Sequence, residues 1–596
     1  MSRMKTLHSL YWLCLALALF LSLPPAGRPG NLIHEPPGAF AAGVPGAVPG
    51  TPSASAQEPW WRHAVIYEIY PRSFGDSNRD GVGDLNGITA HLDYLRDLGV
   101  DAIWITPCFP SPQVDFGYDV SNYQAIAPEY GTMADFDHLT TEAKRRNIRV
   151  LLDFVVNHTS DQHPWFIESA SSRTNPKADW YVWVDGKGPE HRRVPNNWTS
   201  VFGGPAWQWG PQRQQFYYHF FYRQQPDLNW RIPQVRTAMY NVMRFWMNKG
   251  VSGFRLDAVE ALFEDPYLTP DPVKPGRNAY GDPNVQHVHT SDLPEIHDVF
   301  REMRQVVNQY PGGVLVGEAY YPTTAEMATI YGHDDEVNLP MATQVGFTNE
   351  RSAPEIRERL DSLMALPDRD TPLLVFDNHD NVRSWDRYGE GLDARQHVQV
   401  AKVIAATLLA PRGSALIYYG QEIGMKTTPP TRREDVKDPI GRAGWPKEKG
   451  RDGERTPMQW SEANDAGFST AEKTWLPVTP EYKQCNVADE ERDPNSLLNF
   501  YKALLRLRRD NTAFRDGGYQ GINEQDGNVL TFVRTSPHAG TLLVALNYTD
   551  QTQTEDYRRQ GGKAKCLLST FAPQGQTQDL SHLALPPFGV YFGQVQ

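Results

Sequence analysis

Hydrophobic residues recur in short runs of strand length along most of the chain, beginning near residue 65, with helical stretches such as 88–98 and 133–146 between them. Buried strands that alternate with helices predict a parallel sheet, and eight repeats within one domain predict a (β/α)8 TIM barrel of the α/β class. Seven runs are clear and the sixth is weak. The predicted strands are residues 65–70, 102–106, 150–156, 254–259, 314–319, 336–341, 373–376 and 415–419.

Two long excursions interrupt this repeat. Residues 157–226, after the third strand, are rich in Trp, Pro, Asn and Gly, and residues 424–480 follow the eighth strand. Beyond residue 513 the pattern changes to short alternating runs that are typical of antiparallel strands. The predicted organisation is a first part of the barrel (58–156), an inserted small domain (157–226), a second part of the barrel (227–512) and a C-terminal antiparallel β-sandwich domain (513–596).

The first 57 residues have a different composition from the rest. Arg3 and Lys5 precede an apolar stretch of signal-peptide length, residues 10–23, and a spacer rich in Pro, Gly and Ala follows. We expect an export signal and therefore a secreted or periplasmic protein. The apolar stretch is short for a transmembrane helix, so membrane attachment is expected only if the signal stays uncleaved.

Composition narrows the partners. The chain has 596 residues, a formal net charge of −13 at pH 7 and 11% aromatic residues, which argues against a nucleic-acid partner and leaves a neutral small molecule open. Outside the signal, Cys108, Cys485 and Cys566 have no metal-ligand spacing and allow at most one disulfide. Buried free thiols are the favoured interpretation, and a Cys485–Cys566 pair stays open. The sequence carries no signal for an oligomeric state.

The predicted fourth strand carries two charged residues, Arg255 and Asp257, in the stretch Gly-Phe-Arg-Leu-Asp-Ala-Val-Glu. Side chains alternate across a strand, so both point to the same face. Buried charges are unfavourable unless they are paired or used. An internal ion pair that stabilises the sheet is the simplest explanation of this strand alone.

Polar residues at the ends of other strands favour a functional explanation over a structural ion pair, because the carboxyl ends of barrel strands meet at one face. They come from four strands and would converge there: Asp153, Asn157, His158, Arg255, Asp257, Glu318, His379 and Asp380. Any one of them could be a satisfied core residue. Such a gathering of carboxylates and imidazoles is hard to explain by packing.

Three convergent carboxylates suit glycoside hydrolysis. One acid protonates the leaving oxygen, a second carboxylate acts at the sugar carbon, and a third anion stabilises the positive charge of the transition state. Arg255 is expected to keep Asp257 ionised as the nucleophile, while neighbouring anions raise the pKa of Glu318 toward an acid's role.

From residue 60 to its end the chain resembles the α-amylase superfamily of glycoside hydrolases (family 13), within it the α-glucosidase and oligo-1,6-glucosidase group. The specific motifs are residues 153–158 (DFVVNH), 253–259 (GFRLDAV), 317–319 (GEA), 376–380 (FDNHD), 225–229 (QPDLN) and 117–121 (GYDVS).

This resemblance implies a role for each matching residue. Asp257 is the implied nucleophile, Glu318 the general acid/base and Asp380 the transition-state stabiliser. The implied sugar-binding residues are His158, Arg255 and His379. Asp119 and Arg451 are expected to hold the non-reducing end of the sugar together and to close the pocket, so that single glucose units leave a chain end.

Residues 76–84 (DSNRDGVGD) place oxygen ligands at alternate positions, as calcium loops do, but lack the Glu of an EF-hand. The alternative is an Asx-rich turn without metal. The family resemblance supports a structural Ca²⁺ bound by Asp76, Asn78, Asp80, Asp84 and the carbonyl of Val82. No organic cofactor is expected.

Two alternatives to an α-glucosidase stay open. The heavy chains of amino-acid transporters share the fold but have a degraded catalytic set, whereas all three carboxylates are present here. Trehalose or isomaltulose synthases use the same covalent intermediate with a sugar as acceptor. Ala258, next to the nucleophile, indicates a preference for α-1,4 linkages, because related enzymes with α-1,6 preference carry Val there. The expected substrates are maltose and short oligosaccharides.

Overall fold

Eight parallel strands close into a barrel in the computed structural model, which describes residues 58–348 and 350–596. Their order around the barrel is β1-β13-β12-β11-β10-β7-β3-β2, so the predicted TIM barrel is confirmed. The weak sixth strand lies a few residues later than expected. The strands are β1 (Val65–Ile69), β2 (Ala102–Ile105), β3 (Arg149–Val155), β7 (Gly253–Asp257), β10 (Val314–Gly317), β11 (Leu339–Ala342), β12 (Leu373–Val375) and β13 (Ser414–Tyr418).

These strands form where the sequence is continuously apolar, because a strand enclosed by helices outside and by side chains inside has no face toward water. Every residue of β1, β7 and β13 is buried. The register places Asp153 beside Arg255 and Val316 beside Arg255 on its other side. The ends of β3, β7 and β10 are therefore level at one face of the barrel.

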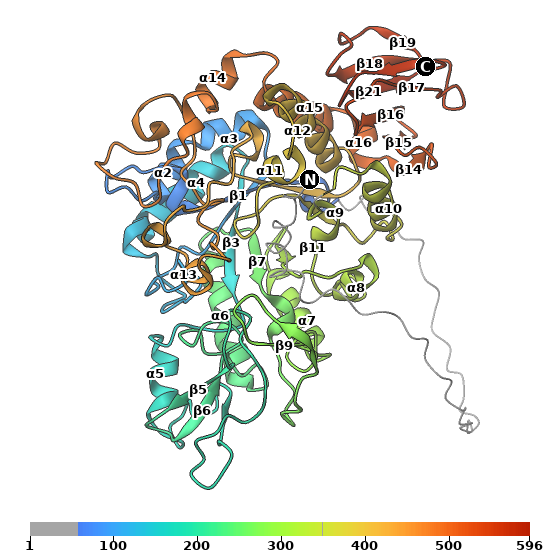
Figure 1. Ribbon diagram of the computed structural model, residues 1–596. Coiled ribbons are helices and arrows are strands. Elements are labelled where there is room, and N and C mark those ends of the chain that lie inside the picture. The colour runs from blue at the N-terminus through green and yellow to red at the C-terminus, as the bar shows by residue number, and fades with distance from the viewer. Residues whose placement is uncertain (1–57, 349) are drawn as a thin grey trace, which may run out of the picture.

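Helices cover the outside of the barrel (Figure 1). The stretch predicted as one helix at 88–98 is two helices that meet at His91, and the helix predicted at 133–146 begins with a capping box between Thr132 and Asp135. The main helices are α2 (Leu85–Ala90), α3 (Leu92–Leu98), α4 (Met133–Arg145), α6 (Pro233–Asn248), α7 (Ile296–Val307), α10 (Ala353–Met364), α12 (Ala394–Leu409) and α15 (Leu497–Asp510).

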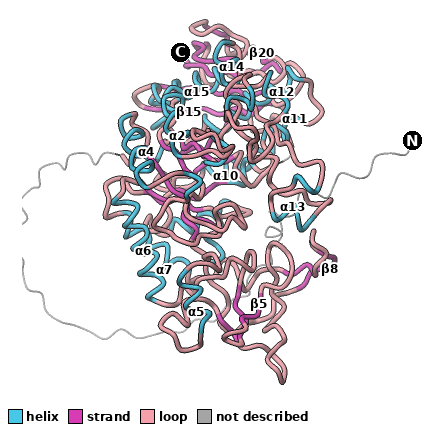
Figure 2. Tube along the Cα trace, turned by 90° about the vertical axis from the view of Figure 1, so that its left-hand side faces the viewer, coloured by secondary structure: helices cyan, strands magenta, loops and turns pink. Residues whose placement is uncertain are grey.

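The inserted small domain lies between β3 and β7. It contains α5 (Pro164–Ser171) and a three-stranded antiparallel sheet of β4 (Trp183–Val184), β6 (Gln215–Tyr218) and β5 (Trp207–Gly210) around an aromatic core. A hairpin of β8 (Val273–Arg277) and β9 (Pro283–Val285) follows β7. Figures 1 and 2 both place the inserted domain at one end of the molecule and the C-terminal domain at the other.

The C-terminal domain is antiparallel, as predicted, with one six-stranded sheet and one two-stranded sheet. Buried Arg534 of β15 joins it to the barrel, since its Nη1 donates a hydrogen bond to the carbonyl of Ala410, between α12 and β13. Its elements are α16 (Thr512–Asp516), β14 (Gly518–Ile522), β15 (Val529–Ser536), β16 (Gly540–Asn547), β17 (Gln553–Glu555), β18 (Lys563–Ser569), β19 (Thr577–Asp579), β20 (Leu583–Leu585) and β21 (Val590–Val595).

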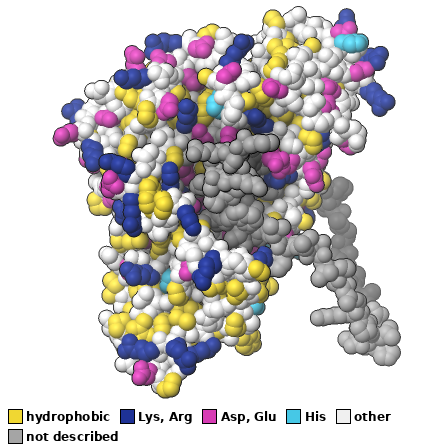
Figure 3. Space-filling view, in the orientation of Figure 1, with side chains coloured by type: hydrophobic (Ala, Val, Ile, Leu, Met, Phe, Trp, Pro, Cys, Tyr) yellow, Lys and Arg dark blue, Asp and Glu magenta, His cyan; other side chains and the backbone are white. Residues whose placement is uncertain are grey.

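Among the described residues, no cysteine forms a disulfide. Basic and acidic side chains are interspersed over the face shown in Figure 3. Cys108, Cys485 and Cys566 are free thiols, as the favoured interpretation had it. In the described part of the chain, no helix is both long enough and apolar enough to cross a membrane. The predicted export signal and spacer lie outside the described residues.

Candidate active site

Three carboxylates gather at the carboxyl end of the barrel. Asp257 is the last residue of β7, Glu318 directly follows β10, and Asp380 lies in the loop after β12. Asp257 and Glu318 are 7% and 5% exposed, so each is enclosed but reachable. Parallel strands bring these residues together although they are far apart in the chain.

Arg255 joins two of these carboxylates to Asp153. Its side chain is fully buried, and its Nη1 lies 2.6 Å from Asp257 Oδ1 and 2.9 Å from Asp153 Oδ1. Its Nη2 lies 2.6 Å from Glu318 Oε1. The guanidinium lies over the ring of Trp104, 4.9 Å from its centroid. One cation therefore holds Asp257 and Glu318 as close neighbours.

Burial acts on both of these carboxyls in the same direction. It raises the pKa of Asp257 from 3.8 to about 7 and the pKa of Glu318 from 4.5 to about 7, although Arg255 lowers both. The direction predicted for Glu318 agrees. The prediction that Arg255 keeps Asp257 ionised considered the charge alone, and the burial of Asp257 acts against it.

Asp380 has the opposite environment. Its Oδ1 lies 2.9 Å from Arg451 Nη1 and 2.7 Å from Arg455 Nη2. Although burial opposes ionisation, the positive charges of Arg451 and Arg455 hold the pKa of Asp380 well below its usual range. Asp380 is therefore a carboxylate at any ordinary pH.

His379, next to Asp380, is fixed by two partners. Its Nδ1 lies 2.5 Å from Glu68 Oε1 and its Nε2 lies 2.6 Å from the Tyr118 hydroxyl. Burial lowers the pKa of His379 and raises the pKa of Glu68, so both shifts favour the uncharged forms of the two groups. With both ring nitrogens bound, the imidazole of His379 has a fixed orientation beside Asp380.

His158 follows β3 and faces the same space. Its Nε2 lies 3.1 Å from both the Tyr118 carbonyl and the side-chain amide of Gln225. Burial lowers the pKa of His158 to about 3, so this imidazole is neutral as well. Gln225 belongs to the inserted domain, which therefore forms one wall of the site.

Asp119 and Arg451, which are expected to hold the non-reducing end of the sugar together, have separate partners. Asp119 is fully buried and accepts hydrogen bonds from the Ser111 hydroxyl and the backbone N–H groups of Val114 and Asp115. Arg451 Nη2 instead lies 2.7 Å from Asp115 Oδ1. Besides Asp380, Arg451 thus contacts Asp115, which lies two residues before Gly117 on the other flank of the same motif.

The loop of residues 76–84 is held by its own carboxylates. Asp76 accepts hydrogen bonds from the backbone N–H groups of Asn78, Arg79 and Gly81. Gly81 has φ +87°, and an added Cβ would lie 2.1 Å from the Lys473 carbonyl oxygen. Oxygen donors of this kind are the ligands that Ca²⁺ prefers, but the carboxylates of Asp76, Asp80 and Asp84 do not converge within 4.8 Å of one another, and the hydrogen bonds are those of an Asx-rich turn.

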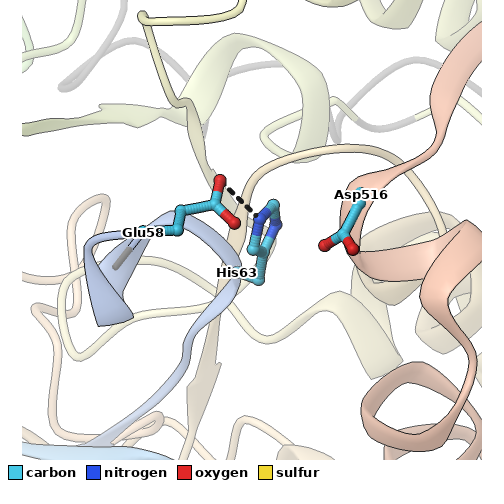
Figure 4. A group of neighbouring side chains, drawn as sticks. All are labelled: Glu58, His63 and Asp516. Carbon is cyan, nitrogen blue, oxygen red and sulfur yellow. Dashed lines mark ion pairs between the residues drawn. The ribbon is translucent and has the colours of Figure 1, made fainter. Parts of the chain in front are cut away.

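A second cluster of possible metal ligands lies where the start of the barrel meets the C-terminal domain (Figure 4). One ligand atom each of Glu58, His63 and Asp516 lies within 4.8 Å of the others, the only such group of three among the described residues. The His63 ring lies between the two carboxylates. Each acid also has an arginine partner, Arg62 at 4.0 Å and Arg515 at 2.9 Å. We interpret the cluster as an ion-pair network.

Comparison with known proteins shows which protein family this chain is similar to. The model of the alpha amylase catalytic domain matches residues 68–517. A probable alpha-glucosidase of Rhizobium meliloti (strain 1021) is 42% identical over 508 residues, which cover 83% of this chain and 91% of that protein. An oligo-1,6-glucosidase of Parageobacillus thermoglucosidasius is 38% identical over 525 residues, again 83% and 91% of the two chains.

The fold has close counterparts among solved structures. The crystal structure of an alpha-glucosyl transfer enzyme, XgtA, matches with a TM-score of 0.82 and 39% identity. The match covers 91% of this chain and 100% of the other. The similarity therefore includes the barrel, the inserted domain and the C-terminal domain.

Proposed function

The chain belongs to the alpha-amylase family, and we propose that it is an exo-acting, retaining α-glucosidase that releases terminal glucose from maltose and short oligosaccharides. The observation that carries this proposal is the contact of one buried guanidinium, that of Arg255, with both Asp257 and Glu318. The printed names of the relatives support hydrolysis of glucosides.

The geometry supports a division of labour between two carboxyls. Asp257 attacks the anomeric carbon and forms a covalent glucosyl ester, while Glu318 gives its proton to the departing glycosidic oxygen. Glu318, now a carboxylate, then takes a proton from water, and the resulting hydroxide attacks the anomeric carbon and frees Asp257. Two displacements at one carbon retain its configuration. Carboxyls that share one guanidinium are near neighbours, and a short separation of the two carboxyls is typical of retaining enzymes.

Asp380 is placed to stabilise the positive charge that develops on the sugar ring, because it stays ionised between Arg451 and Arg455. Arg451 also contacts Asp115 from the opposite wall. A substrate whose end lies against the pair of Arg451 and Asp115 can extend in one direction only. This closed end supports cleavage from the non-reducing terminus.

The preference for α-1,4 linkages rests on Ala258. Its backbone N–H donates a hydrogen bond to Glu318 Oε2 at 3.0 Å, so this residue lies beside the proposed acid. A small side chain there leaves room for a 4-linked leaving sugar, an effect of about 1–3 kcal/mol. Overall similarity does not decide the linkage, since a relative named oligo-1,6-glucosidase is 38% identical.

Maltose is the substrate that tests the proposal. Hydrolysis should release glucose whose first-formed anomer is α by NMR, and β-glucose would contradict the retaining mechanism. Glucosyl transfer is the second candidate, because one solved counterpart is a transfer enzyme. It would appear as trehalose, isomaltose or longer products beside glucose. A transporter heavy chain would give no product at all, and the intact set of carboxyls argues against it.

Two further proposals are separate from the chemistry. We propose that residues 76–84 hold a structural Ca²⁺, supported by the donor set of Asp76, Asn78, Asp80, Asp84 and the Val82 carbonyl. We also propose that the protein is exported, on the basis of the N-terminal signal alone.

A further inference from the structure

Asp438 is a fully buried carboxylate that contacts Arg451, the arginine proposed to close the pocket. It belongs to the long loop after β13 and precedes the short helix α13 (Pro439–Gly444). Asp438 Oδ2 accepts hydrogen bonds from the backbone N–H of Arg451 at 2.6 Å and from its Nε at 2.9 Å. Oδ1 accepts a third, from Nη2 at 3.1 Å. A planar guanidinium that is hydrogen-bonded to both carboxylate oxygens of Asp438 has a defined orientation.

Asp438 is itself fixed by its surroundings. Its backbone N–H donates to both carboxylate oxygens of Asp452, at 3.0 and 3.2 Å, and its Oδ1 also caps α13 through the N–H of Ile440. Gly450 has φ +76°, and an added Cβ would lie 2.8 Å from Asp438 Oδ2. The backbone before Arg451 thus approaches the carboxylate as only glycine allows.

The far side of Arg451 faces the reaction. Its Nη1 and Nη2 reach Asp380 and Asp115, and its guanidinium lies 5.8 Å from the ring centroid of Phe202 in the inserted domain. Arg451 therefore links the loop after β13 to Asp380, to Asp115 and to the inserted domain. Asp438 itself takes part in none of these contacts with Asp380, Asp115 and Phe202.

We propose that Asp438 is a positioning residue, which holds Arg451 across the closed end of the pocket and thereby makes the enzyme exo-acting. This inference rests on the proposed function. A long side chain such as Arg has many rotamers, and the position of its head sets where the substrate must end. Without Asp438, Arg451 is still drawn to Asp380 and Asp115 by charge but is no longer oriented from behind.

The test compares Asp438→Asn with the wild type. Asn keeps the volume and can still cap α13, so the fold should survive. We expect KM for maltose to rise about 10- to 100-fold, the effect of losing hydrogen bonds to a charged group. The value of kcat should fall less, because Arg455 still contacts Asp380. Asp435→Asn is the matched control, since Asp435 lies in the same loop but pairs with exposed Arg432.

A second readout is the cleavage of a maltooligosaccharide whose non-reducing end is blocked. Asp438→Asn should raise the rate on blocked chains relative to free chains, which general loss of stability would not do. In a double-mutant cycle with Arg451→Lys, the two effects on KM should be strongly non-additive if Asp438 acts through Arg451.

The outcomes separate the two ideas. A wild type that ignores maltose, or that cleaves blocked and free chains equally, overturns the proposed function itself. A wild type restricted to free ends, together with an Asp438→Asn variant of unchanged KM and unchanged preference, overturns the positioning role alone. Additive effects in the double-mutant cycle overturn it too.

Discussion

Replacing Glu318 by Gln should make the protein more stable at neutral and alkaline pH while abolishing its activity. Glu318 is 5% exposed, and its contacts are Arg255 Nη2 and the backbone N–H of Ala258. Gln fills the same volume without a charge. The Glu318→Gln variant therefore measures how much stability the wild type loses because it keeps an ionisable carboxyl at this buried position.

The magnitude follows from the pKa. Burial raises the pKa of Glu318 from 4.5 to about 7. A carboxyl whose pKa is raised by folding stabilises the folded state below about pH 4.5, and this contribution is lost as the pH rises through about 7. The difference corresponds to about 3 kcal/mol. Gln loses nothing over this range, and Arg255 keeps its contacts with Asp153 and Asp257.

Thermal melting of both proteins between about pH 5 and pH 8 is the assay. The advantage of Glu318→Gln should grow with pH and reach a few degrees at the upper end, since about 3 kcal/mol is spread over a large domain. Glu358→Gln, exposed on α10, is the control and should follow the wild type. Equal pH dependence of Glu318→Gln and wild type would refute the reasoning.

The remaining predictions concern chemistry, metal and linkage. Asp257→Asn should lower kcat by about four powers of ten while the fold stays intact, because it removes the nucleophile; substantial residual turnover would contradict this. The value of kcat/KM should fall above about pH 7 as Glu318 loses the proton it donates, and a flat profile would contradict it. Chelation, or Asp80→Ala without chelator, should lower the melting temperature if the loop binds Ca²⁺, and identical curves at low calcium would exclude the ion. Ala258→Val should shift the ratio of isomaltose to maltose hydrolysis upward by about tenfold, with some loss of stability because Ala258 has φ +44°; an unchanged ratio would assign the linkage to other loops.

The barrel was predictable because its strands are enclosed on both sides and so appear as continuous apolar runs. The sixth strand was the weakest prediction because two buried polar residues, Glu336 and Asn338, precede it. Glu336 accepts a hydrogen bond from Arg301, and Asn338 accepts one from the backbone N–H of Leu315. The strand therefore starts only at Leu339. Polar residues that are satisfied by distant partners cannot be recognised from local pattern.

The sequence motif does not predict which aspartate contacts Arg451. Asp115 and Asp119 flank the same Gly-Tyr pair, and either could reach a distant arginine. The sequence does not tell that three donors from its own loop satisfy Asp119. Only the folded loop shows that Asp115 keeps an oxygen for Arg451. Asp438 was missed for the same reason, since nothing near it in the chain indicates its partner.

The protonation of the site is the property that the sequence could indicate least. A strand with Arg255 and Asp257 suggests one charge balancing another, and hence an ionised nucleophile. In the fold the same guanidinium also contacts Asp153 and Glu318, so one cation faces three buried carboxyls. A single positive charge cannot hold three anions in a site that excludes water, and a proton must stay with the group. Retaining hydrolysis needs that proton on Glu318 before the first step, so the shortage of positive charge around Arg255 is what prepares the acid.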